Sequence, residues 1–170
     1  VGSLVALVFA FLFYKLMMKE SEGNDTMKEI AGHVREGAYA YLRQQYKVVG
    51  LVFIGLVILL TVLAFFGIQN PFVPFAFLTG GFFSGLCGFL GMKTATSASA
   101  RTAEGARQSL NKGLTVAFRS GAVMGLVVVG FGLLDISIWY IVLNYMYDNN
   151  IWNLSQTLAA GTSLDAQLAQ

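Results

Sequence analysis

The fold is decided by residues 48–92, VVGLVFIGLVILLTVLAFFGIQNPFVPFAFLTGGFFSGLCGFLGM, which lie between Lys47 and Lys93 and carry no charged side chain. A single membrane-spanning helix needs roughly 20 apolar residues, and this run is 45 residues long. It therefore predicts two membrane-spanning helices, about 48–66 and 72–92. Glycine, asparagine and proline favour turns, so the segment 67–71, followed by Pro74, predicts a tight reversal between them.

The composition of the whole chain agrees with a membrane location. Of the 170 residues, 56% are hydrophobic and 12% are charged, and the mean hydropathy is +0.65. Soluble domains carry roughly 25% charged and 45–50% apolar residues. These values exclude a soluble enzyme domain, a disordered chain and a nucleic-acid-binding module. The single cysteine, Cys87, excludes an internal disulfide framework and a multi-cysteine metal site.

Two further apolar stretches complete a predicted set of four spans. Residues 120–147 are interrupted by one charge, at Asp135, and residues 1–18 are apolar up to Lys15. No basic segment precedes the first stretch, as it would in a signal peptide. We therefore expect Val1 to lie in the middle of a first transmembrane helix, and the chain to be an integral, multi-pass membrane protein.

The distribution of basic residues predicts the orientation of these spans. All 11 Lys and Arg residues lie within 15–47 and 93–119. Basic residues accumulate in cytoplasmic loops. We expect both basic segments to be cytoplasmic, and the N-terminus, the 69–74 turn and the tail 148–170 to lie outside.

Both basic segments are predicted to be helical extensions of the spans, over 26–47 and 93–119. Thr26-x-x-Glu29 has the form of a capping box, and Asn24 and Asp25 are alternative caps. No proline occurs from Thr26 to Phe66, which predicts one helix of 41 residues. The second extension is expected to turn at 111–113. Residues 1–147 are thus predicted to form an all-α transmembrane bundle with long helical extensions.

Two kinds of residue are candidates for a specific role: glycines for helix packing and one aspartate for an ion pathway. Small residues let membrane helices approach closely, and two glycine stripes have the required spacing: Gly81, Gly85 and Gly88, and Gly121 with Gly125. Asp135 is the one ionisable residue well inside a span, a position that suggests an ion pathway. Its alternative role is a hydrogen bond to a neighbouring helix, beside Ser137.

A resemblance to a known family takes the prediction further. Residues 91–107 read GMKTATSASARTAEGAR, and the similarity continues through SLNKGL at 109–114 and AFRSGAVMG at 117–125. A second stretch is Ile30 with REGAYAYLRQQYK at 35–47. Together these resemble the N-terminal quarter of the membrane-integral, ion-translocating inorganic pyrophosphatases, over about residues 4–147.

The resemblance implies an ion pump. Members are homodimers with sixteen transmembrane helices per subunit. They bind pyrophosphate through magnesium ions, aspartates and lysines on inner helices, and hydrolysis moves protons or sodium ions outward. A potassium requirement is left open. The family's ligand motifs lie on later helices, so no catalytic, substrate-binding or metal-binding residue and no bound cofactor is expected here. The chain is expected to be an N-terminal outer-ring fragment that contacts the lipid bilayer and the inner helices and is inactive alone.

Two other functions remain open from the sequence. The chain could be a non-catalytic four-span accessory or assembly subunit, since no catalytic cluster is visible. It could also be a small ion channel that uses Asp135.

Overall fold

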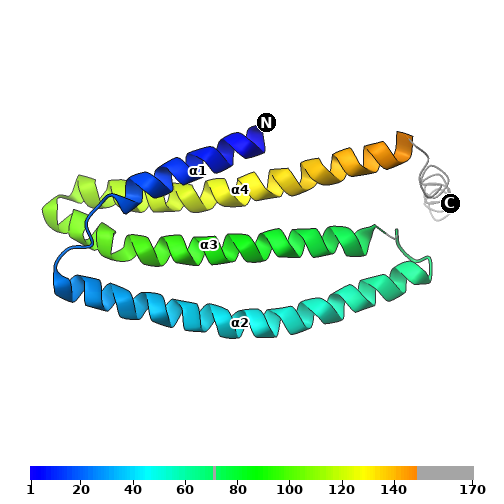
Figure 1. Cartoon of the computed structure of the whole chain (residues 1–170), viewed down its shortest axis with the longest axis horizontal. Coiled ribbons are helices and arrows are strands. Elements are labelled where there is room, and N and C mark those ends of the chain that lie inside the picture. Colours follow the sequence, from blue (N-terminus) through cyan, green and yellow to red (C-terminus); the bar gives the residue numbers. More distant parts are fainter. Residues whose placement is uncertain (71, 149–170) are drawn as a thin grey trace, which may run out of the picture. The chain divides into compact units, whose positions relative to one another are not determined.

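The computed structural model describes residues 1–70 and 72–148, and these form four helices (Figure 1). The helices are α1 (Gly2–Met18), α2 (Asp25–Phe65), α3 (Val73–Gln108) and α4 (Leu110–Asp148). No strand occurs among the described residues, which confirms the all-α prediction. The chain forms two compact units, Val1–Leu134 and Asp135–Gln170. In the second unit the described residues, 135–148, are the last turns of α4.

Helix α2 is a single helix of 41 residues, the length predicted from the absence of proline. Its N-cap is Asn24, whose side-chain oxygen accepts a hydrogen bond from the backbone N–H of Met27 at 2.9 Å. The predicted capping box at Thr26 is therefore wrong. Asn24, one of the two alternative caps, caps the helix instead. Asparagine satisfies free N–H groups at a helix start as well as threonine does, so the helix begins earlier, at Asp25.

The reversal between α2 and α3 begins at Gly67, as predicted. Gly67 has a φ of +73°, a conformation that glycine adopts without steric cost. Its N–H donates to the carbonyl of Ala64 and that of Ile68 donates to the carbonyl of Leu63, both at 3.1 Å. These two bonds form a Schellman motif that ends α2. Pro74 lies in the first turn of α3, and Pro71 lies outside the described residues.

The turn predicted at 111–113 is wrong, because a single residue, Ser109, separates α3 from α4. Ser109 has an extended backbone (φ −163°, ψ 150°), and its N–H donates to the Gly105 carbonyl at 2.9 Å. Its side-chain oxygen accepts from the N–H of Lys112 at 3.2 Å, as an N-cap serine does. Ser109 thus ends one helix and caps the next, and Gly113 lies inside α4.

Close glycine contacts permit this short connection. A Cβ on Gly113 would lie 2.8 Å from the Cβ and 2.9 Å from the Cα of Ala106. A Cβ on Gly105 would lie 3.2 Å from the Gly113 Cα. The two helices therefore begin their antiparallel course with their backbones almost in contact.

Within the first unit, α2 lies along α3 (Figure 1), and α1 shares a core with α3 and α4. Phe53 of α2 stacks on Phe77 of α3 with ring centroids 4.7 Å apart. The core of the other three helices is formed by the buried residues Ala10, Cys87, Val123 and Val127. The part of α3 that is predicted to extend beyond the membrane is packed too, since Ala98 contacts Met17 and Val116.

Three helices, α2, α3 and α4, are long and apolar enough to cross a membrane. Helix α1 has 17 residues, about 25 Å at ~1.5 Å per residue, which is shorter than the ~30 Å hydrocarbon core. The prediction of a fourth span at 1–18 therefore stays a prediction. Large apolar side chains of α2, such as Leu51 and Ile58, are more than half exposed. An apolar surface of this kind is that of an integral membrane protein. The tail 149–170 lies outside the described residues.

Candidate functional site

The most connected polar group of the described residues lies around the α1–α2 loop, residues 19–24. Gly23 in this loop has a φ of +91°, and a Cβ there would lie 2.5 Å from the Met27 sulfur and 3.0 Å from Glu104 Oε2. Only glycine fits both the backbone conformation and the space. The loop therefore lies directly against α3.

Glu22 of this loop lies between two arginines from different helices. Arg35 of α2 donates from Nη1 and Nη2 to the two carboxylate oxygens, each at 3.0 Å. Arg101 of α3 places Nη1 at 2.7 Å from Oε1 of the same carboxylate. A paired bidentate arginine is among the strongest charge-assisted contacts in proteins. One loop carboxylate therefore links α2 to α3.

Arg101 is the buried member of this group, with 8% of its surface exposed. Besides Glu22, its guanidinium donates to the backbone carbonyl of Glu20 at 3.1 Å and to that of Ser97. Burying a charge is costly unless it is paired and hydrogen-bonded. These partners meet that requirement.

Glu20 extends the group to α4. Its carboxylate oxygens lie 3.5 Å from Lys112 Nζ and 3.6 Å from Arg119 Nη1. The two loop carboxylates together thus contact charged side chains of α2, α3 and α4. We call this set the loop cluster; its members are Glu20, Glu22, Arg35, Arg101, Lys112 and Arg119.

Glu104 is a second buried carboxylate beside the loop, with 6% of its surface exposed. Its Oε1 accepts from Arg107 Nη2 at 3.1 Å and from Gln108 Nε2 at 3.0 Å. Its Oε2 faces Gly23 and lies 2.9 Å from Arg107 Nε. These two atoms form an ion pair, but their angles are not those of a hydrogen bond. Both side-chain partners come from the same helix, so this group stabilises the end of α3.

The loop cluster makes stability depend on pH. The hydrogen bonds from Arg35, together with the charges of Arg101 and Arg35, hold the pKa of the Glu22 carboxyl below its ordinary value of 4.5, although burial acts in the opposite direction. The unfolded chain then binds a proton at higher pH than the folded one. This contribution to stability is present above the ordinary value and is lost as pH falls through the lowered pKa of the folded protein.

We expect the free energy of unfolding to fall as pH drops from neutral to below 4.5, and to fall less in Glu22→Gln, which has no carboxyl to protonate. The measurement is denaturant titration in mild detergent across this pH range, followed by helical circular dichroism. Identical pH dependence in both proteins would contradict the assignment of the effect to Glu22.

The structure places the predicted packing glycines in different surroundings. A Cβ on Gly81 would lie 2.2 Å from the Phe53 ring, and one on Gly88 would lie 2.9 Å from the Tyr46 hydroxyl. That hydroxyl donates to the carbonyl of Gly85 at 2.6 Å. At Gly121 and Gly125, in contrast, the space that a Cβ would take is open, and no described atom of a neighbouring helix lies within 4 Å of it. The packing role of the five glycines stays a prediction.

Asp135 is half-buried and belongs to the second unit, Asp135–Gln170. No ion pair to it is found among the described residues. Its role in an ion pathway remains a prediction. Within residues 1–70 and 72–148, no three His, Cys, Asp or Glu side chains are grouped so as to hold a metal ion.

Sequence reasoning missed the loop cluster, because it explained the basic residues by membrane orientation alone. A signal was present in α3, where the buried residues recur at helical spacing: Thr94, Ser97, Ala98, Arg101, Glu104 and Gly105. An arginine and a glutamate on a buried helical face require partners, and Glu20 and Glu22 are acidic residues of the loop that packs there.

Comparison with known proteins identifies the chain's relatives. The family model described as "Inorganic H+ pyrophosphatase" matches residues 4–170. A relative from Bacteroides thetaiotaomicron, named "Putative K(+)-stimulated pyrophosphate-energized sodium pump", is 69% identical over 145 residues, which is 85% of this chain and 20% of the relative. The "K(+)-insensitive pyrophosphate-energized proton pump 2" of Moorella thermoacetica is 42% identical over 80% of this chain and 19% of its own length.

A third relative, the "K(+)-stimulated pyrophosphate-energized sodium pump" of Thermotoga maritima, is 38% identical over 82% of this chain and 19% of its own length. The chain thus spans about a fifth of the length of the curated relatives it matches. The family match begins at residue 4 and reaches into every described helix. With a family model that matches almost every residue, this chain belongs to the inorganic H+ pyrophosphatase family.

Proposed function

We propose that this chain is part of a membrane pump that hydrolyses inorganic pyrophosphate and uses the free energy to move protons or sodium ions out of the cytoplasm. The observation that carries the proposal is the family match over residues 4–170. Relatives named as sodium pumps and as proton pumps both occur among the matches. Magnesium as the cofactor, pyrophosphate as the substrate and a second copy of the subunit as partner belong to the same proposal.

Within that pump, we propose that residues 1–148 act as a scaffold and do not carry out the chemistry. The loop cluster supports this role, because its acidic residues are engaged with arginines and a lysine of α2, α3 and α4. Carboxylates that bind magnesium must be free to accept the metal. The ends of the helices that carry the basic residues would face the cytoplasm, in keeping with the preference of Lys and Arg for that side.

The test is magnesium-dependent release of phosphate from pyrophosphate in membranes. We would compare cells that express this chain alone with cells that express the complete natural reading frame that contains it. We expect hydrolysis only with the complete product, with uptake of protons or sodium ions into inverted vesicles. Assays with and without added sodium and potassium then assign the ion and any potassium stimulation.

Two results would contradict the proposal. Absence of hydrolysis from both products would leave the chain as an accessory or assembly subunit. Hydrolysis by this chain alone would reveal a catalytic centre within it and would overturn the scaffold role.

A further inference from the structure

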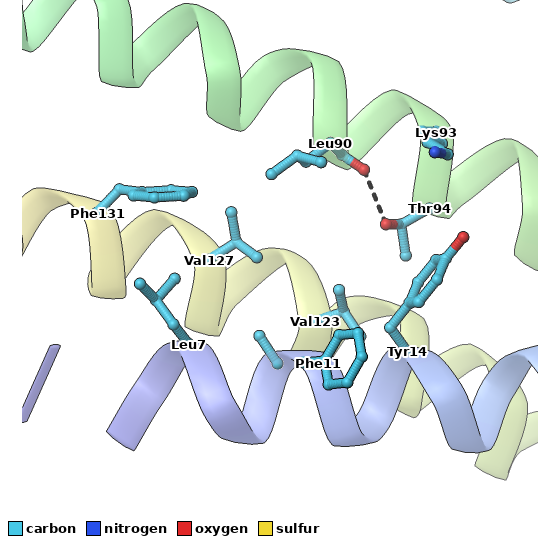
Figure 2. Close-up of a pocket in the computed structure, with 10 residues that line it drawn as sticks. Leu7, Phe11, Tyr14, Leu90, Lys93, Thr94, Val123, Val127 and Phe131 are labelled. Atoms are coloured by element: carbon cyan, nitrogen blue, oxygen red, sulfur yellow. Dashed lines mark hydrogen bonds between the residues drawn. The ribbon is translucent and has the colours of Figure 1, made fainter. Parts of the chain in front are cut away.

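A groove between α1, α3 and α4 has a form that suits a lipid. Its volume is about 280 Å³, about twice that of the ~150 Å³ apolar cavity known to bind benzene. Figure 2 shows apolar side chains at one end, with Leu7 opposite Phe131, and polar groups at the other, where Lys93 and the Tyr14 hydroxyl lie. The groove is therefore apolar along its length and cationic at one end.

The polar end lies where the uncharged stretches of the sequence end, the level at which we expect the phosphate groups of the membrane. Lys93 is the first charged residue after the uncharged run 48–92, and Lys15 is the first charged side chain after the apolar residues 1–14. The Lys15 ammonium lies 4.9 Å from the ring centroid of Phe11, and Phe11 lines the groove. Two cations thus lie near one end of the groove, at the boundary between the apolar and polar parts of the helices.

Among the described residues, these two lysines lack a carboxylate partner, which six of the other nine basic residues have. Lys15 and Lys93 have no carboxylate partner within residues 1–70 and 72–148. Both side chains are exposed, so an anionic group from outside this part of the protein can pair with them without displacing a carboxylate. In contrast, six basic residues each lie within 4 Å of a carboxylate: Lys28, Arg35, Arg101, Arg107, Lys112 and Arg119.

We propose that the groove binds one acyl chain of an anionic phospholipid, whose phosphate interacts with Lys93, Lys15 and the Tyr14 hydroxyl. Basic pockets between membrane helices bind anionic lipid headgroups. A phospholipid supplies an apolar chain and a phosphate in one molecule, whereas a protein helix would have to bring a carboxylate to the headgroup level. The proposal does not depend on pyrophosphate hydrolysis.

The test uses the complete gene product in vesicles of equimolar phosphatidylcholine and phosphatidylglycerol. A photoreactive residue is placed in the groove as Phe11→p-benzoylphenylalanine, and adducts are identified by mass spectrometry. The comparison position is Leu51→p-benzoylphenylalanine, on the exposed surface of α2. We expect phosphatidylglycerol adducts to exceed phosphatidylcholine adducts about thirtyfold at position 11, because two lysines near the surface each confer a preference of about fivefold. At position 51 we expect no preference.

Charge variants provide the matched comparison. Lys93→Gln should lower the preference at position 11 about fivefold, to the preference that Lys15 alone confers. Lys47→Gln should retain the full preference, because Lys47 stands at the other end of the same uncharged run, has no carboxylate partner among the described residues and does not line the groove. Phosphatidylglycerol retained through purification, measured by native mass spectrometry, should fall in Lys93→Gln and not in Lys47→Gln. This second measurement needs no unnatural residue.

The other occupants give different results. An adduct between position 11 and a peptide of the same chain outside α1, α3 and α4 would show that another protein helix fills the groove, and an adduct to a second copy would show a subunit interface. Equal labelling by the two lipids, or no adduct where position 51 gives one, would also overturn the proposal. None of these outcomes alters the result of the hydrolysis assay, so the two proposals fail separately.

Discussion

Replacement of Glu22 by alanine is expected to lower the free energy of unfolding by about 3–5 kcal/mol, the cost of removing one partner of a buried ion pair. The variant leaves the guanidinium of Arg101 buried without its carboxylate, and Arg35 loses both of its hydrogen bonds to the loop. The measurement is denaturant titration of the complete gene product in mild detergent, followed by helical circular dichroism.

The matched control is Asp25→Ala, three residues further along the chain. Asp25 also pairs with a basic residue, Lys28, at 3.0 Å, but its side chain is fully exposed. Exposed ion pairs contribute little to stability, so this variant should unfold close to the parent protein. Equal destabilisation by the two substitutions would mean that the loop cluster contributes no more than a surface pair.

Gly113→Val is expected to destabilise the protein by about 3 kcal/mol, the upper range for added atoms in a packed interior. The new side chain would begin 2.8 Å from the Ala106 Cβ and 2.9 Å from its backbone nitrogen. Backbone atoms cannot rotate away as the end of a side chain can. The same titration measures the effect, and the α3–α4 connection should become accessible to protease.

The control for this variant is Gly32→Val in α2. No described atom of a neighbouring element lies within 4 Å of the position that a Cβ would take on Gly32. Valine is slightly better than glycine in a helix, so this variant should match or slightly exceed the parent in stability. If Gly113→Val behaves in the same way, the close approach at the α3–α4 connection does not contribute to the fold.

The long helices could be predicted because their causes are local in the sequence. The uncharged run 48–92 predicts two spans and the reversal at Gly67, and the absence of proline predicts the 41 residues of α2. The Ser109 connection could not be predicted in this way. Asn111 and Gly113 have the composition of a turn, but the approach of Gly105 to Gly113 lets a single residue complete it. That approach is a tertiary contact, which local composition does not report.

The loop cluster was harder to predict than the helices, because its partners are distant in sequence. Glu22 and Arg35 are 13 positions apart, and the Glu20 carbonyl and Arg101 are 81 apart. A basic residue at a membrane edge has the same appearance in the sequence whether or not it has a carboxylate partner. Arg101 pairs with Glu22, whereas Lys93 has no carboxylate partner among the described residues. This difference is visible only in the three-dimensional structure.

The single-residue connection at Ser109 has a mechanical consequence. A one-residue joint between two long helices leaves little freedom of movement, and the close approach of Gly105 to Gly113 restricts rotation about it. A slide of either helix by one turn, ~5.4 Å, would have to break the capping bonds of Ser109. We therefore expect an axial displacement of α3 to be coupled, through this joint, to the adjoining part of α4.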